Sequence, residues 1–139
     1  MKNEAIIDGV TVGGQPDAND LRAGRFQTVV NVRGEKEPGN DTAALLAGSD
    51  VAYTAVPFTI DTVTKDDIAR IRAAVDAGAG AVLVHCMGGT RAALAAAILA
   101  AEKDGSGAAG ALAKAAAADY EIIGTPYGAF VERYFSGRP

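Results

Sequence analysis

The chain has 139 residues, enough for one domain with a hydrophobic core, and we expect a single domain over residues 1–139. Hydrophobic residues make up 49% of it, as in an ordinary globular protein, and the net charge of −4 argues against non-specific binding to nucleic acid or anionic membranes. The single cysteine excludes an internal disulfide and suits a reducing compartment.

Nothing in the sequence directs the chain to a membrane. The first ten residues lack the long apolar segment of a signal peptide, and the alanine-rich run over residues 92–101 is too short to span a bilayer. We therefore expect a cytoplasmic protein with no membrane partner and no nucleic-acid partner.

The first half of the chain predicts short strands joined by turns. Residues 6–16 suggest a hairpin, or two short strands, with a turn at Asp8-Gly9. A short helix is expected over residues 16–26, with Gly24 near its end. Four elements follow: a buried strand at 27–34, a polar loop at 34–41, a short helix at 42–48 and a strand at 51–58 that stops near Pro57.

The second half predicts longer helices around one further strand. Thr64 caps a helix, with Asp67 as a short-armed form of the capping box, and Ile68 and Ile71 fall on one helical face. A strand is expected at 78–86, a helix at 90–105, an alanine-rich helix from about 108 to 120, and then a last helix. Four residues of this last helix form an apolar stripe at helical spacing, which indicates core packing: Tyr127, Phe130, Val131 and Tyr134.

Strands alternate with helices along the chain. This order predicts an α/β fold with a mainly parallel central sheet flanked by helices on both faces. Ligands of such sheets bind beyond the carboxyl ends of the strands. Three strand ends carry unusual groups, which we expect to share one crevice: Arg33, the segment 57–61 and the pair His85-Cys86.

The most informative stretch is HCMGGTR, residues 85–91. A strand that leads through a glycine-containing loop into a helix can bind an anion, because loop N–H groups converge and the helix N-terminus adds partial positive charge. The same field favours a thiolate at Cys86, and Arg91 offers a planar pair of donors that suits a tetrahedral oxyanion. A lone cysteine or histidine is more often a buried structural residue, but their adjacency in this setting favours a functional site.

Four stretches in this order resemble the cysteine-dependent phosphatases of the protein tyrosine phosphatase superfamily, and more closely the bacterial beta-lactamase-hydrolase-like phosphatases. They lie within about residues 5–105 and read GGQP at 13–16, VVNVRG at 29–34, AYTAVPF at 52–58 and HCMGGTR at 85–91. The resemblance implies a tyrosine-phosphatase-like fold. It also implies hydrolysis of a phosphomonoester, carried by a small molecule or a phosphoprotein, without metal or cofactor.

The resemblance implies roles for the residues of this loop. Cys86 would attack phosphorus as a thiolate, Arg91 would stabilise the transition-state charge, and His85 would orient the loop and help keep Cys86 ionised. The amides expected to hold the phosphoryl oxygens belong to Met87, Gly88, Gly89 and Thr90.

Three residues outside the loop are further candidates. Asp61 stands where the superfamily has its general acid, with a loop-capping role as the alternative. Arg33 is either a second oxyanion or substrate contact, or a surface arginine paired with Glu35 or Glu37. Gln15, in its glycine- and proline-containing turn, is a candidate substrate contact.

Two departures from the tyrosine phosphatases leave other functions open. Four residues separate Cys86 from Arg91 instead of five, and Ala92 replaces the usual hydroxyl residue. Four is also the spacing of rhodanese sulfurtransferases, which hold a persulfide on the cysteine. A non-catalytic oxyanion-binding module is the third possibility. One histidine and one cysteine do not make a zinc site, and the sequence specifies neither substrate nor oligomeric state.

Overall fold

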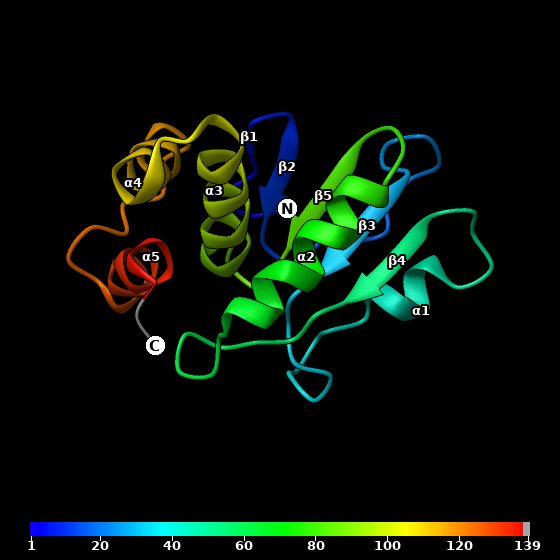
Figure 1. Cartoon of the computed structure of the whole chain (residues 1–139). Coiled ribbons are helices and arrows are strands. Elements are labelled where there is room, and N and C mark those ends of the chain that lie inside the picture. The colour runs from blue at the N-terminus through cyan, green and yellow to red at the C-terminus, as the bar shows by residue number, and fades with distance from the viewer. Residues whose placement is uncertain (138–139) are drawn as a thin grey trace.

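The candidate loop, residues 85–91, follows the central strand of a five-stranded sheet. The computed structural model describes residues 1–137, with strand order β1-β2-β5-β3-β4 (Figure 1). Only the β1–β2 pair is antiparallel, and the other three pairings are parallel. The strands are β1 (Ala5–Ile7), β2 (Val10–Gly13), β3 (Thr28–Asn31), β4 (Ala52–Ala55) and β5 (Val82–His85). The mainly parallel sheet that the sequence predicts is confirmed.

Helices cover both faces of this sheet. Val30 and Val84 point to the face packed under α2 and α3, whereas Val29 and Leu83, one residue earlier in each strand, join Leu46 of α1 on the other face. Helices α4 and α5 pack on α3 (Figure 1). The helices are α1 (Thr42–Leu46), α2 (Lys65–Ala77), α3 (Thr90–Asp104), α4 (Gly107–Ala117) and α5 (Pro126–Ser136).

Several local predictions are confirmed by the backbone. The turn of the β1–β2 hairpin lies at Asp8 and Gly9, which both take positive φ angles, as a tight two-residue turn requires. Thr64 and Asp67 form the full capping box of α2. On α5, Phe130 is buried with Val131, and the tyrosines of the stripe are half-buried against the same core.

The predicted helix over residues 16–26 is wrong, because this segment forms a series of turns. The carboxylate of Asp17 accepts from the N–H of Asp20, and the carboxylate of Asp20 accepts from the N–H of Asp17. These reciprocal bonds have the pattern of a capping box, and the N–H of Leu21 donates to the carbonyl of Asp17 at 3.1 Å, but the turn does not continue as a helix, and Gly24 takes a positive φ angle of 85°. Arg25 then pairs with Asp20 and holds the turn closed. The fourth helix also ends at Ala117, three residues earlier than expected.

No helix among residues 1–137 is long and apolar enough to cross a membrane.

Candidate active site

The stretch from His85 to Arg91 joins β5 to α3 at the carboxyl edge of the sheet. His85 and Cys86 are buried, with 0% and 2% of their surface exposed, whereas Met87 is 60% exposed. Gly89 caps α3 with a φ angle of 106°, in the left-handed region that favours glycine. A Cβ atom there would also lie 2.1 Å from the hydroxyl oxygen of Tyr120. The turn into the helix therefore requires glycine for conformation and for space.

Most N–H groups of the loop have no acceptor among the described residues. The N–H of Gly89 donates to Cys86 Sγ at 3.0 Å. Within residues 1–137, the N–H groups of Met87, Gly88 and Thr90 have no protein acceptor. Together with the N-terminus of the 15-residue helix α3, these donors form a site suited to an oxyanion.

The Arg91 guanidinium is held by a carboxylate from a distant loop. Its two terminal nitrogens donate to Glu37 Oε2 and Oε1 at 2.8 and 3.1 Å, and Nη1 also donates to the carbonyl of Phe58 at 3.1 Å. These bonds to Arg91 lower the pKa of Glu37 to about 2. Among the described residues, the Nε–H of Arg91 has no acceptor, so the guanidinium keeps a donor for an anion.

Arg33 binds the same Glu37 carboxylate as Arg91 does. It is 2% exposed, so the alternative of a surface arginine is wrong, although the expected pairing with Glu37 is present at 3.1 Å. Its other nitrogens donate to Gln15 Oε1 at 2.8 Å and to the carbonyl of Pro38 at 2.6 Å. Arg33, Glu37 and Arg91 thus form one partly buried charge network that joins the loop after β3 to the start of α3.

His85 connects the loop to α1. Its Nε2 lies 3.0 Å from the hydroxyl of Thr42, which accepts from Gln15 Nε2 at 2.8 Å. The hydroxyl proton of Thr42 can then go to Nε2, which leaves Nδ1–H to donate to the carbonyl of Cys86 at 3.2 Å. Burial lowers the pKa of His85 to about 4. A neutral imidazole therefore orients the loop through hydrogen bonds, without the positive charge of an imidazolium.

This buried imidazole predicts a specific pH dependence of stability. Between pH about 6.5 and 4 the unfolded chain binds a proton at His85 that the folded chain does not, so the free energy of unfolding falls as the pH is lowered, by about 3 kcal/mol. The sequence has only one histidine, so above pH about 5, where the carboxylates stay ionised, the fall reports on one residue. Urea unfolding at a series of pH values measures the fall.

The matched variant for that measurement is His85→Asn. Its stability is expected to be lower at pH 7 but nearly flat from pH about 6.5 to 5, because no imidazole titrates. In both proteins the ionised Glu37 also contributes to stability. Because its pKa is lowered, this contribution is lost only as the pH falls from about 4.5 through about 2. Equal slopes for both proteins above pH about 5 would contradict a neutral buried His85.

Asp61 lies on the exposed turn that follows β4. The cap of this turn is Thr62, whose hydroxyl accepts from the N–H of Thr59 at 2.9 Å, so the loop-capping alternative for Asp61 is wrong. In the described part of the chain Asp61 makes no hydrogen bond or ion pair with the residues of the loop. The same segment reaches the site through Phe58, whose carbonyl bonds Arg91.

The remaining candidates lie around the loop. Gln15 bridges Arg33 and Thr42, and Thr90 is the half-buried first residue of α3. Two residues of the network were not expected at the site: Glu37 was predicted only as a possible partner for Arg33, and Thr42 was not predicted at all. The one sequence signal for Glu37 was its place four residues after Arg33, in a polar loop that follows a buried strand.

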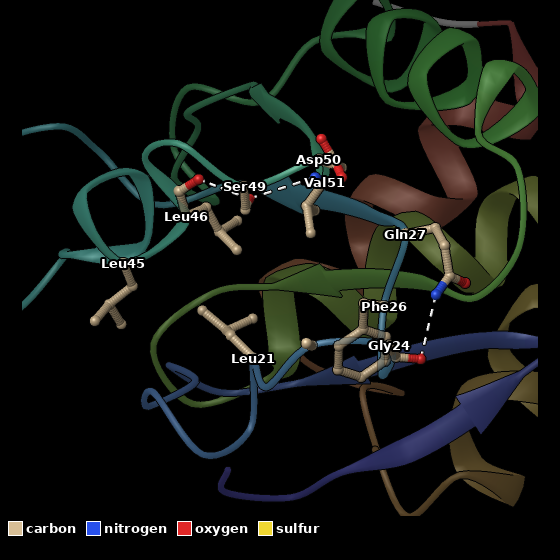
Figure 2. Close-up of a pocket in the computed structure, with 10 residues that line it drawn as sticks. Leu21, Gly24, Phe26, Gln27, Leu45, Leu46, Ser49, Asp50 and Val51 are labelled. Atoms are coloured by element: carbon tan, nitrogen blue, oxygen red, sulfur yellow. Dashed lines mark hydrogen bonds between the residues drawn. The ribbon is translucent and has the colours of Figure 1, made fainter.

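A separate cavity of about 350 Å³ lies near the amino ends of β3 and β4 (Figure 2). Its apolar lining comes from Leu21, Phe26, Leu45 and Val51, and its polar lining includes Gln27, Ser49 and Asp50. Because the carboxyl ends of these strands carry the network of Arg33 and Arg91, the cavity is not part of the loop site.

Solved structures share this arrangement of strands and helices. Tk-PTP, in its G95A mutant form, superposes with a TM-score of 0.78 and 19% identity, over 96% of this chain and 94% of that one. TpbA from Pseudomonas aeruginosa superposes with a TM-score of 0.71 and 21% identity, over 99% of this chain and 86% of that one. The fold, with its cysteine at the carboxyl edge of the sheet, is therefore tyrosine-phosphatase-like.

Sequence comparison gives the family. The profile described as "Beta-lactamase hydrolase-like protein, phosphatase-like domain" matches residues 4–103, and the chain belongs to this family. A beta-lactamase hydrolase-like protein from Xylella fastidiosa (strain Temecula1 / ATCC 700964) is 36% identical over 103 residues, which are 66% of this chain and 23% of that protein. The chain thus spans about a quarter of the length of that relative, and the resemblance based on four short stretches is confirmed.

Proposed function

We propose that this chain is a cysteine-dependent phosphatase that hydrolyses phosphomonoesters through a phosphocysteine intermediate. The observation that carries the proposal is the set of unpaired loop N–H groups at Met87, Gly88 and Thr90, which lie between a buried cysteine and Arg91. Three donors and a guanidinium match the three non-bridging oxygens of a phosphoryl group. TpbA has been solved with pTyr, in which this same group is attached to an aromatic ring.

In the first step the Cys86 thiolate attacks phosphorus, so that an S–P bond forms and the bond from phosphorus to the leaving oxygen breaks. The leaving oxygen takes its proton from Asp61. Glu37 accepts from both Nη groups of Arg91, so the Nε–H of Arg91 remains to donate to a phosphoryl oxygen. In the second step water attacks phosphorus, gives a proton to Asp61, and releases inorganic phosphate and the thiolate.

The four-residue spacing from Cys86 to Arg91 favours one rival, a sulfurtransferase that carries a persulfide on Cys86. Two assays on the same preparation separate the functions: release of phosphate from aryl phosphates, and formation of thiocyanate from thiosulfate and cyanide. Phosphate release alone supports the proposal, and thiocyanate formation alone overturns it. A module that only binds oxyanions would gain thermal stability with vanadate and turn over in neither assay.

Asp61→Asn is expected to lower the rate according to the leaving group. A nitrophenolate leaves without a proton, so its release should fall less than about threefold, whereas release of an alkyl alcohol should fall about a hundredfold. The measurement is kcat for one aryl and one alkyl phosphate. The control is Asp66→Asn, which removes the same charge from an exposed ion pair with Arg70 at the start of α2. Equal losses for both substrates would show that Asp61 is not the acid.

A further inference from the structure

Two carbonyl groups of the nucleophile loop, residues 86–89, are held from outside. The carbonyl of Met87 accepts from the N–H of Gln15 at 3.0 Å. The carbonyl of Gly88 accepts from the side-chain amide of Asn3 at 2.8 Å. Both contacts come from the N-terminal hairpin region, and Gly14 pairs with Gly88 in an isolated bridge.

These contacts fix the direction of the N–H groups, because a trans peptide points its C=O and N–H to opposite sides. The C=O of Gly88 belongs to the same peptide as the N–H of Gly89, which donates to Cys86 Sγ at 3.0 Å. The C=O of Met87 belongs to the same peptide as the N–H of Gly88. Holding the carbonyls outward therefore turns these two N–H groups toward the sulfur side.

The contact from Asn3 is itself held by the C-terminal third of the chain. The hydroxyl of Tyr120, in the connection between α4 and α5, donates to the carbonyl of Asn3 at 2.5 Å. Tyr120 is 7% exposed and lies directly against Gly89. Burial, followed by the nearby Cys86 charge, raises the pKa of Tyr120 to about 12, so the phenol remains a donor. Asn3 has a φ angle of 56°, which asparagine and glycine tolerate best.

We propose that Asn3 and Tyr120 are positioning residues, which act through the Gly88–Gly89 peptide to keep its N–H directed at Cys86 Sγ. For the phosphoryl group this inference rests on the proposed function, but for the thiolate it does not. The family profile ends at residue 103, and Tyr120 lies beyond it. The C-terminal third thus contributes to the site without touching the substrate.

The test uses Tyr120→Phe, which removes the hydroxyl and keeps the ring. Alkylation of Cys86, the only cysteine, by iodoacetamide reports the thiolate without any need for turnover. The rate of alkylation at pH about 6.5 should fall three- to tenfold, while the rate at pH about 10 stays unchanged. The matched control is Tyr134→Phe, which loses a hydroxyl bound to Glu102 and Arg72, away from the loop.

A second variant guards against a simple folding defect. Asn3→Gly keeps the positive φ angle at an exposed position and removes only the amide donor to Gly88. It should show the same alkylation change as Tyr120→Phe, with kcat reduced more than KM is raised. Alkylation profiles of both variants that coincide with Tyr134→Phe would overturn the inference. Changed alkylation in a protein without phosphatase activity would instead keep the inference and reject the proposed function.

Discussion

Cys86→Ser is expected to lower the hydrolysis of aryl phosphates at least about ten-thousand-fold, because a serine hydroxyl in this position has no base to activate it. The imidazole of His85 faces Thr42 and the Cys86 carbonyl, so it is not placed to take the serine proton. The measurement is the initial rate of phosphate release. Mass spectrometry of the acid-quenched wild type should also show one added phosphoryl group, and the variant should show none.

The same variant supplies its own control. The loop amides and Arg91 are unchanged in Cys86→Ser, so vanadate or phosphate should still raise the melting temperature of the variant. Retained ligand stabilisation together with lost turnover assigns the loss to the nucleophile. A variant that keeps more than about one hundredth of the wild-type rate would refute the phosphocysteine mechanism.

Arg91→Lys is expected to lower kcat about a hundred- to a thousandfold. An ammonium group is a compact charge on a flexible chain, so it cannot bond both oxygens of Glu37 and still direct a further N–H at the phosphoryl group. The charge is conserved, and the variant therefore tests geometry. Because the lost contact strengthens in the transition state, kcat should fall far more than KM rises.

Arg72→Lys is the matched control for this second variant. Arg72 is also half-buried and bonded to a carboxylate, Glu102, and to Tyr134, but it lies between α2, α3 and α5, outside the loop. Arg72→Lys should lower the free energy of unfolding and leave kcat within about twofold of the wild-type value. If Arg91→Lys behaves like Arg72→Lys in steady-state kinetics, the guanidinium has no special role in the reaction.

The centre of the site could be predicted because it is contiguous in sequence. Strand, cysteine, glycines, arginine and helix follow one another over residues 82–104, and each has a local preference for the structure that it adopts. The same holds for Thr64 and Asp67, whose capping box involves bonds over three residues. Patterns of this length can be read without knowing how distant segments pack.

Two of the supporting contacts could not be predicted, because the partners are distant in sequence. Glu37 meets Arg91 across 54 positions, and Tyr120 meets Asn3 across 117. No periodicity or spacing relates such pairs, since only the folded chain brings them together. The wrong helix at 16–26 has a similar cause, since its side chains bind partners distant in sequence: the Asp20 carboxylate accepts from the Met1 amino group, and Arg25 pairs with Glu4.

Residues 92–101 of α3 are all buried, and most are alanines. A larger side chain on this helix would have to displace its neighbours, at a cost of about 1–3 kcal/mol for each overpacked position. Apart from Glu37 and Asp61, the polar loops at 34–41 and 57–63 have mostly exposed side chains and tolerate exchange more readily. Evolution of this scaffold can therefore change what enters the active site by changing the loops around it, while the helix that carries Arg91 tolerates few larger side chains.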